Sequence, residues 1–497
     1  MRTLHAEWTK FRTVRGWVLG AVGAALASVL FLLVGTASSN QGAGADAALP
    51  AGPGGEAVND SFSFLHTTVT GDGSLTVPVT SLTGILADPD AGPSDTVSGL
   101  TPWSKAGIIL KTSLTQGSSY AAVMATAAHG VRMQHDFVHD RAGDVTGTPS
   151  PATPQWLRLV RTGTTVTGYD STDGVHWTEI GTAEIAGTTL QVGLFVTAPA
   201  TVDTANASSA PATASATFGQ PTLTGAWNND GWSYTQVGND AGTSGSYVPT
   251  ASGSYRANDD GFTITGAGDI APVVGGPALG PAFTVETFLI GTFVCLLVLS
   301  VVAVQFGAGE YRRGLLTLTL TATPRRGRVV AAKAIVVTGV AFVVGVGAAA
   351  ASLALGQARA SAAHFAVLTV PPTEQVRAVL GTGLLLAATT LLALSLGVVL
   401  RRSAAAIAAV ATLVVVPYVL AMGGMLPTDA AQWLLRLTPA AGFAIQQTLS
   451  RYAHVLSVYT PATGYFPLPP WAGLAVLGAW TLALTGLAWW MLRRRNA

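Results

Sequence analysis

Six long apolar segments constrain what this 497-residue chain can fold into more strongly than any other feature of its sequence. Each has about 20 residues, the length that an α-helix needs to cross the roughly 30 Å hydrocarbon core of a bilayer. Charged residues make up only 10% of the chain, against about 25% in soluble proteins. The sequence therefore predicts a multi-pass membrane protein and argues against a soluble enzyme. The predicted spans are Trp17–Thr36, Phe288–Phe306, Ala334–Leu355, Ala378–Leu400, Ser403–Met425 and Trp471–Leu492.

The distribution of charge predicts how these spans are oriented. Residues 37–286 carry 7 basic and 21 acidic side chains, whereas the rest of the chain carries 19 basic and 4 acidic ones. If the spans alternate in direction, 15 basic residues fall on one side and four in the short loops of the other. Basic residues collect on the cytoplasmic side of a membrane. We therefore expect both termini in the cytoplasm, the acidic middle outside the cell and the chain in the plasma membrane. This split indicates a compartment boundary rather than nucleic-acid binding.

The first apolar segment has a second interpretation. Arg2, Lys10, Arg12 and Arg15 precede it, as basic residues precede the apolar core of a secretory signal peptide. That core usually has about 7–15 residues, so the length of segment 17–36 favours an uncleaved anchor. Residues 1–16 are then a cytoplasmic segment.

Small residues in the spans predict where helices touch. Glycine permits close helix contact in lipid, where no hydrophobic force drives helices together. Pro417 is expected to kink the fifth span. The predicted spans contain no lysine or carboxylate, which argues against a transporter coupled to protons or ions. The glycines expected at helix contacts are Gly16, Gly20, Gly23, Gly339, Gly345 and Gly347.

The acidic middle has a different residue pattern from the spans. Residues 37–58 form a linker rich in Ala, Gly, Ser and Pro. Residues 59–282 contain short β-like runs separated by turn signals such as Asp72-Gly73 and Asp173-Gly174. This pattern predicts an all-β sandwich or jelly roll inserted between the first two spans. The strands expected are Leu75–Leu82, Ala106–Leu110, Tyr120–Met124, Trp156–Val160 and Leu190–Val196, with Trp156, Tyr169, Trp177 and Phe195 in the core.

Four runs in this region occur in a consistent order: residues 71–76 (GDGSLT), 105–110 (KAGIIL), 156–161 (WLRLVR) and 169–177 (YDSTDGVHW). They resemble the DUF1349 group of concanavalin A-like β-sandwiches. The resemblance implies a sandwich fold, and members of that fold bind carbohydrate or serve as accessory modules. An extracellular glycan is therefore a candidate ligand, without identified binding residues. Four later aromatics belong to the packing or form a glycan-facing surface, and packing is favoured: Trp227, Trp232, Tyr234 and Tyr255.

Motifs for chemistry are missing from the sequence. Cys295 is the single cysteine, so there is no disulfide framework. His129, His135 and His139 lack a neighbouring Cys or Glu, and exposed strand histidines are favoured over a metal site. None of the four lysines follows a glycine, so the chain has no Gly-Lys-Ser/Thr phosphate-binding loop. We expect no catalytic residues and no directly bound cofactor.

Two inner segments carry a second resemblance. The first is the N-terminal run 4–15 (LHAEWTKFRTVR), and the second is 309–328, which contains EYRRG from Glu310 and TPRR from Thr323. Together with the six-span layout, they resemble ABC-2 type transporter permeases of actinobacteria. The resemblance implies an amphipathic elbow over residues 1–16 with Glu7, Trp8, Lys10 and Arg12. It also implies a cytoplasmic coupling loop over 307–333, and the residues expected there to contact the ATPase are Glu310, Tyr311, Arg312, Arg313, Arg325 and Arg326. Charge alone favours an ordinary solvated inner loop, and the family resemblance is what favours the coupling role.

The expected function follows from this second resemblance. It implies a permease subunit that is not itself an enzyme, paired with a second permease half as a homodimer or heterodimer. Cytoplasmic ABC ATPase subunits would hydrolyse the ATP. The alternative is a membrane-anchored protein that binds or senses extracellular glycans. Residues 426–470 are expected to form short re-entrant helices or an amphipathic helix at the bilayer surface.

Overall fold

A computed structural model describes residues 2–37, 49–87, 95–203, 208–228, 231–238, 253–276, 282–312 and 326–494. The chain divides into two compact units. The helical unit comprises Met1–Gly42, Phe283–Leu449 and Tyr459–Ala497, and the sandwich unit comprises Ala43–Ala282 and Ser450–Val458. The second unit therefore includes a short segment that lies far from the rest of it in sequence.

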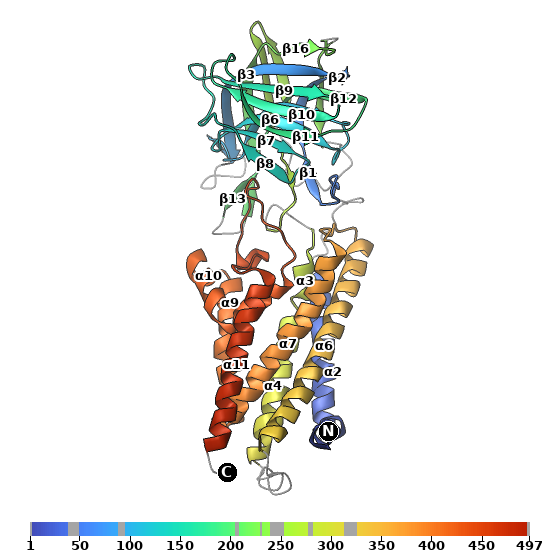
Figure 1. Cartoon of the computed structure of the whole chain (residues 1–497), viewed down its shortest axis with the longest axis vertical. Coiled ribbons are helices and arrows are strands. Elements are labelled where there is room, and N and C mark those ends of the chain that lie inside the picture. The colour runs from blue at the N-terminus through green and yellow to red at the C-terminus, as the bar shows by residue number, and fades with distance from the viewer. Residues whose placement is uncertain are drawn as a thin grey trace. The chain divides into compact units, whose positions relative to one another are not determined.

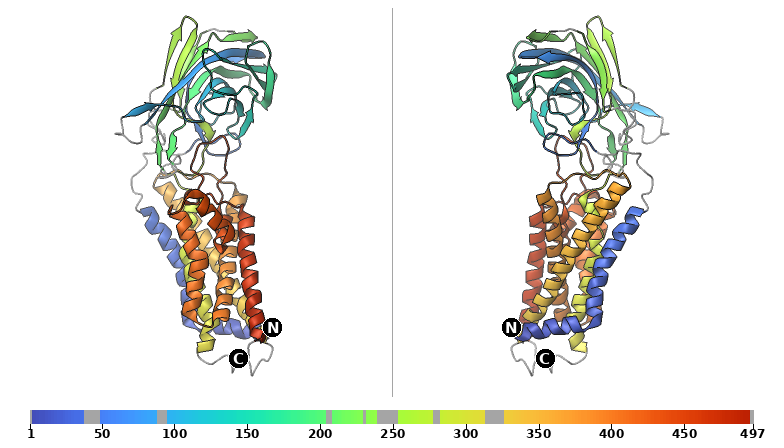
Figure 2. Two further views of the ribbon diagram at one scale, coloured as in Figure 1. Left: turned by 90° about the vertical axis from the view of Figure 1, so that its left-hand side faces the viewer. Right: turned by 90° about the vertical axis from the view of Figure 1, so that its right-hand side faces the viewer.

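Six helices in the described residues are long and apolar enough to cross a membrane. Figures 1 and 2 show that these helices run side by side. They agree with the six predicted segments, as expected of a multi-pass membrane protein. The helices are α2 (Arg15–Ala37), α3 and α4 (Val285–Leu289 and Thr292–Arg312), α6 (Arg326–Ala362), α7 (Pro372–Leu400), α8 to α9 (Ser403–Val410, Ala411–Val415 as η2, Val416–Met422) and α11 (Pro470–Arg494).

Two helices extend beyond their apolar segments. α6 begins at Arg326, before the predicted start at Ala334, and α7 begins at Pro372, before Ala378. Hydropathy detects only the apolar part of a helix, whereas backbone hydrogen bonding continues through polar turns. Because α6 starts early, it includes Lys333, which is buried. The expectation that the spans hold no lysine is therefore wrong for α6.

Close helix contacts occur at two of the expected glycines. A Cβ on Gly345 of α6 would lie 3.0 Å from the Cα of Gly383 in α7. A Cβ on Gly20 of α2 would lie 2.9 Å from a methyl of Val302 in α4. A larger residue at either position would have to separate the helices. The other expected glycines have no heavy atom within 4 Å of such a Cβ: Gly16, Gly23, Gly339 and Gly347.

The fifth span is interrupted where the sequence predicts a kink. A π-helical turn, η2, precedes α9, and Pro417 lies in the first turn of α9. Proline has no backbone N–H and clashes with the preceding turn, so the local hydrogen bonding shifts. The expected kink thus takes the form of a π-helical turn.

The loop between α9 and α11 contains short helices of two kinds. α10 (Thr428–Leu437) buries Ala431 and Leu435 but exposes Trp433 and Leu437. Every residue of η3 (Pro439–Gln446) is buried, and η4 (Pro461–Thr463) is a single turn. The loop therefore contains one amphipathic helix and one helix packed inside the unit.

The sandwich unit contains two large antiparallel sheets (Figure 1). One sheet has the order β11 (Thr178–Glu184), β10 (Thr165–Ser171), β9 (Gln155–Thr162), β3 (Gly73–Ala87), β15 (Ala212–Gly219), β19 (Gly261–Gly266) and β18 (Ser254–Asn258), with β4 (Thr96–Ser98) and β16 (Thr222–Gly225) paired to β3. The other has the order β17 (Ser233–Val237), β2 (Phe62–Thr70), β12 (Thr189–Thr197), β5 (Lys105–Lys111), β6 (Tyr120–Thr126), β7 (Val131–His135) and β8 (His139–Ala142). Two small ribbons pair β1 (Val58–Asp60) with β20 (Ile270–Pro272), and β13 (Thr201–Asp203) with β14 (Ser208–Ala210). The predicted sandwich is confirmed as a fold.

The middle strands of the seven-stranded sheet are buried on both faces. One face packs against the nine-stranded sheet, through residues such as Leu65, Ile108 and Val123. The other face carries a second apolar cluster with Phe62 and Phe195. Val58 of β1 and Ile270 of β20 also belong to that cluster, so the β1–β20 ribbon covers part of the second face.

Three of the four predicted core aromatics are placed wrongly. Phe195 is fully buried, but Trp156, Tyr169 and Trp177 are only half-buried. Along β9, Leu157 and Leu159 are fully buried and alternate with more exposed neighbours. Successive side chains of a strand point to opposite faces, so Trp156 lies on the outer face of the nine-stranded sheet.

Candidate functional site

The N-terminal helix forms an elbow against the bundle. α1 (Arg2–Thr13) ends just before α2 begins at Arg15, and Figure 2 shows it lying across the end of the long helices. Glu7 of α1 is buried and accepts a hydrogen bond from the Nζ atom of Lys333 in α6 at 3.0 Å. Both side chains are only 5% exposed. Because an unpaired buried charge is costly, this ion pair fixes the elbow to the first turns of α6.

Aromatic rings surround the same ion pair. The Lys333 ammonium lies 4.4 Å from the ring centroid of Phe306 in α4, a cation–π contact. Phe11 of the elbow and Trp17 of α2 both meet Phe306 edge-on, at 5.8 and 4.8 Å between ring centroids. Four helices therefore contribute to one cluster, which we call the elbow cluster: Glu7, Phe11, Trp17, Phe306 and Lys333.

Lys10 adds a second cation beside the elbow cluster. Burial, and then repulsion from Lys333, lower the pKa of Lys10 from its ordinary value, while Glu7 opposes this shift. Glu7 thus lies near two lysines and compensates part of their repulsion. Trp8 and Arg12, the other two predicted elbow residues, are exposed on α1. The elbow therefore has one side fixed to the bundle and one side available to water, lipid or a partner.

Most of the predicted coupling residues lie at the edge of the described structure. Glu310, Tyr311 and Arg312 form the end of α4, and Arg326 begins α6. Only the backbone of these four residues is described, and Arg313 and Arg325 lie outside the described residues. The structure therefore places the two ends of the coupling segment. Lys333 of the elbow cluster lies close in sequence to the second of these ends, where α6 begins.

Sequence reasoning missed the partner of the elbow. Lys333 counted only as one of the basic residues of the inner loop, and Phe306 only as the end of a span. The one signal available was that Glu7 and Lys333 belong to the few charged residues next to apolar segments. Nothing in the sequence pairs residues 326 positions apart.

The sandwich unit holds two further buried lysines. Lys111 at the end of β5 donates to Asp60 Oδ2 at 2.7 Å, with both side chains fully buried. Lys105 at the start of β5 donates to Asp269 Oδ1 at 2.8 Å and to the Ile270 carbonyl at 2.7 Å. Asp60 belongs to β1, and Asp269 directly precedes β20. The two ion pairs therefore bind the β1–β20 ribbon to the middle of the seven-stranded sheet.

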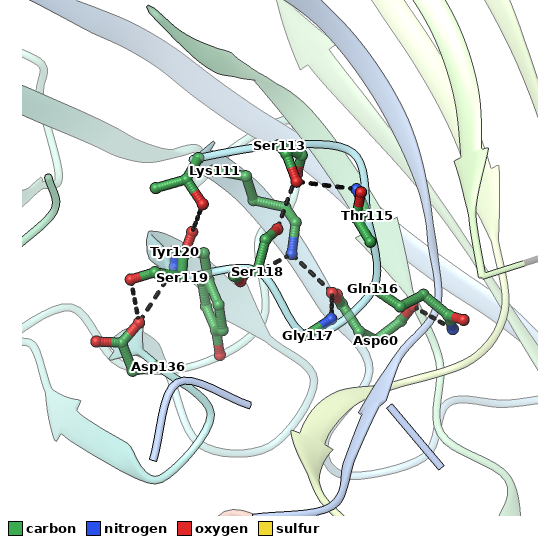
Figure 3. Close-up of polar contacts among 11 residues, drawn as sticks. Asp60, Lys111, Ser113, Thr115, Gln116, Gly117, Ser118, Ser119, Tyr120 and Asp136 are labelled. Carbon is green, nitrogen blue, oxygen red and sulfur yellow. Dashed lines mark hydrogen bonds and ion pairs between the residues drawn. The ribbon is translucent and has the colours of Figure 1, made fainter. Parts of the chain in front are cut away.

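Figure 3 shows the surroundings of the Lys111–Asp60 pair. Asp60 Oδ2 also accepts from the backbone N–H of Gly117 at 2.8 Å, and Lys111 donates to the Ser118 carbonyl at 3.3 Å. The Lys111 ammonium lies 5.5 Å from the ring centroid of Tyr120. Burial raises the pKa of Asp60 while Lys111 opposes the rise, and burial followed by the nearby Asp60 carboxylate raises the pKa of Tyr120 well above its ordinary value. The charges of Lys111 and Asp60 compensate each other within the fold, so this pair reads as structural rather than catalytic.

The remaining candidates in the sandwich have structural roles. His129 stacks on Trp103 at 4.0 Å, and His135 stacks on His139 at 4.3 Å. Among the residues that the structure describes, no group of three or more His, Cys, Asp or Glu side chains is placed to hold a metal ion. Of the four later aromatics, Trp227 is buried and donates to the Gly71 carbonyl, which agrees with packing. Tyr255 is 46% exposed and stacks on Tyr234.

Comparisons with known proteins add little to this geometry. No family model matches the chain, and no curated protein matches its sequence. One similar solved structure is a functionally unknown protein from Saccharomyces cerevisiae, at 16% identity and a TM-score of 0.23, covering 34% of this chain and 77% of that one. Two others are the GH43 protein BlXynB from Bacillus licheniformis and a mutant of it, at 15% and 17% identity and TM-scores of 0.19 and 0.18. These two cover 33% and 31% of this chain, which spans only 33% and 27% of their length. Similarity at this level assigns no activity.

Proposed function

We propose that the chain is the permease subunit of an ATP-driven ABC-2 type transporter, with ATP hydrolysed by a separate cytoplasmic subunit. The observation that carries the proposal is the elbow helix α1, tied through Glu7 to Lys333 near the start of α6. The expected contact segment for the ATPase, residues 307–333, ends at that same lysine. A partner that moves this segment would therefore move the elbow as well.

The packing suggests how such a movement passes through the helices. Glu7 and Lys333 are buried together, so separating them would leave a charge without its partner. α1 and the first turns of α6 should therefore move as one body. α6 in turn approaches α7 closely at Gly345 and Gly383, where there is no room for an independent shift. In this proposal the termini are cytoplasmic, the sandwich is extracellular, and a second permease half completes the pathway.

The glycan-binding alternative has less support from the described side chains. Several of the aromatics that could form a sugar-binding surface are used inside the fold. Trp227 is buried, and Phe62 and Phe195 are fully buried beside the β1–β20 ribbon. Tyr255 is the more exposed member of its stacked pair with Tyr234. Tyr255 and the half-buried rings of Trp156 and Trp177 give weak support for a saccharide site.

Affinity purification tests the proposal directly. The tagged chain would be extracted from its native membrane in mild detergent, and co-eluting proteins identified by mass spectrometry. We expect a P-loop ATPase in stoichiometric amount, because the chain has no nucleotide-binding motif of its own. The double variant Arg312→Gln/Arg313→Gln should lose most of this ATPase.

The matched control is Arg401→Gln/Arg402→Gln, which neutralises the basic pair between α7 and α8. This variant should retain the ATPase, since the resemblance assigns no contact to that turn. A wild-type chain that elutes intact and monodisperse without any ATPase would contradict the proposal and favour the anchored binding protein.

A further inference from the structure

The segment Ser450–Val458, which we call the strap, belongs to the sandwich unit although its neighbours on both sides belong to the helical unit. The strap lies in the loop between α9 and α11, a few residues after η3 and just before η4. Loops of this length in compact proteins are commonly functional. The contacts of the strap inside the sandwich unit show what holds it there.

His454 makes the central polar contact of the strap. It is buried, and its Nε2 atom lies 2.8 Å from the backbone carbonyl oxygen of Phe137. A carbonyl can only accept, so Nε2 carries the proton and donates. Burial lowers the pKa of His454, which is consistent with a neutral ring. At His454 the strap is therefore held by a directed hydrogen bond from a buried side chain.

The carbonyl that receives this bond is held by a tight turn. Asp136 and Phe137, between β7 and β8, have φ angles of +46° and +63°, a left-handed conformation that costs energy in residues other than glycine. The Asp136 carboxylate accepts hydrogen bonds from the Ser119 hydroxyl at 2.5 Å and from the Tyr120 backbone N–H at 3.2 Å, as Figure 3 shows. The sandwich therefore fixes the acceptor in place.

Apolar contacts complete the surface around the strap. The rings of Trp103 and His454 meet edge-on, with 6.4 Å between their centroids. Trp103 also stacks on the ring of His129. Val455 and Val458 are 7% and 1% exposed. The Ser457 hydroxyl donates to the Gly275 carbonyl at 2.8 Å. Polar and apolar residues of the strap are both engaged, as in a bound peptide ligand.

We propose that the sandwich is a peptide-binding module whose ligand is the strap of the same chain, and that this binding restrains the loop joining α9 to α11. The strap joins η3 to η4 along the chain, so docking shortens the free length of the loop between them. Tethering gives the strap an effective concentration in the millimolar range for a short linker, which keeps the surface occupied. This inference stands whether or not an ATPase binds the helical unit.

Hydrogen exchange of the full chain in detergent, read by mass spectrometry, tests the proposal. His454→Ala should reduce protection of residues 450–458 by about 5- to 100-fold, the range for losing a buried hydrogen bond and leaving its acceptor unpaired. If docking restrains the loop, protection should also fall in η3 and in residues 459–466. Peptides from β5 and β12 report whether the sandwich itself remains folded.

Two variants serve as controls. His176→Ala removes a histidine that is 89% exposed in the same unit and should change nothing in the strap. Ser457→Ala removes one hydrogen bond and should give a smaller loss of exchange protection in residues 450–458. If His454→Ala unfolds β5 and β12, the Ser457→Ala variant alone tests the docking. The docking is overturned if strap protection is unchanged in Ser457→Ala, and also in His454→Ala where that variant remains folded. A loss confined to 450–458 overturns the restraint on the loop.

Binding in trans provides an independent test. A labelled nine-residue peptide with the sequence of 450–458 should bind the full-length His454→Ala chain, whose own strap no longer competes. The wild-type chain should bind it at least about tenfold more weakly, because its surface is already occupied. The same peptide carrying Ala at position 454 is the matched control and should not bind either chain. Equal binding of both peptides would contradict recognition through His454.

Discussion

Two lysine–carboxylate pairs, one in each unit, look alike in length but differ in their surroundings. Lys111 and Asp60 in the sandwich unit are 2.7 Å apart and fully buried. Lys333 and Glu7 in the helical unit are 3.0 Å apart and 5% exposed. The first pair has further backbone partners at Gly117 and Ser118. The second pair has a second lysine, Lys10, beside it.

The difference indicates two different tasks. A buried pair whose hydrogen bonds are largely met inside one rigid sheet holds a single arrangement. A pair that joins two helices instead links the movement of one helix to that of the other. We therefore assign Lys111–Asp60 to the stability of the sandwich and Lys333–Glu7 to the coupling of α1 with α6. Each prediction below probes one side of this contrast.

The largest effect is expected in the sandwich. Asp60→Asn leaves Lys111 charged, fully buried and without a carboxylate, and should reduce the free energy of unfolding by about 3–5 kcal/mol. Thermal unfolding of the full chain in detergent, followed by hydrogen exchange of β5 and β6, measures it. His176→Ala, at a histidine that is 89% exposed, is the control and should leave the unfolding unchanged. A loss below about 1 kcal/mol for Asp60→Asn would show that Lys111 finds another partner.

A smaller effect is expected at the elbow. Glu7→Gln keeps a hydrogen-bond acceptor but removes the charge facing Lys333, and should cost about 1.5–3 kcal/mol, as for other hydrogen bonds to charged groups. Exchange of α1 amides should rise while those of α7 stay protected. Exchanging the two residues, Glu7→Lys with Lys333→Glu, should restore part of the loss, whereas Arg12→Gln on the exposed side of α1 should have no effect. No recovery in the exchanged variant would argue against a direct charge pair.

The close approach of α6 and α7 should give an effect of about 1–3 kcal/mol. Gly345→Val places methyl groups where a Cβ already meets Gly383 and Leu386 at 3.0 and 2.9 Å, so the helices must separate. Gly347→Val on the same helix has no atom within 4 Å of its Cβ and is the matched control. Thermal unfolding in detergent compares the two. Equal losses would mean that helix propensity, not packing, determines the result.

The smallest effect concerns pH and the strap. Burial, followed by Lys105, lowers the pKa of His454, while the Phe137 carbonyl and the Asp140 and Asp269 carboxylates oppose the shift. Below about pH 6.5 an undocked histidine takes up a proton that the docked ring excludes, so docking should weaken as the pH falls toward the lowered pKa. We expect strap protection, corrected for intrinsic exchange, to fall by up to about tenfold per pH unit in that window. His454→Gln does not titrate and should show no such dependence; a parallel fall in that variant would point to another group.

The sequence predicts the positions of helices and strands better than it predicts which of their side chains are buried. The run Ala106–Leu110 marks β5, but the strand includes a lysine at each end, and both lysines are fully buried. A lysine normally signals a solvated strand end, so the covered second face of the seven-stranded sheet could not be foreseen. The prediction of Trp156 as a core residue is wrong, although the alternation with Leu157 and Leu159 along β9 already indicates that it lies on the other face.

The candidate sites show the same division. The sequence identified Glu7 and Lys10 as elbow residues through a family resemblance, but it supplied no partner for them. It gave no reason to single out His454 in a loop of ordinary composition. The Lys333–Glu7 and His454–Phe137 contacts join residues 326 and 317 positions apart. Composition and periodicity describe neighbours in sequence and carry no information about such pairs.

The sequence by itself therefore determined six apolar helices and an inserted sandwich, because hydropathy, strand alternation and turn residues act over a few neighbouring positions. Only the tertiary structure decided that Glu7 meets Lys333, that two lysines lie inside the sandwich, and that the strap belongs to the sandwich unit. A buried charge or imidazole is stable only where packing brings its partner within hydrogen-bonding distance. That partner is selected by the folded chain as a whole.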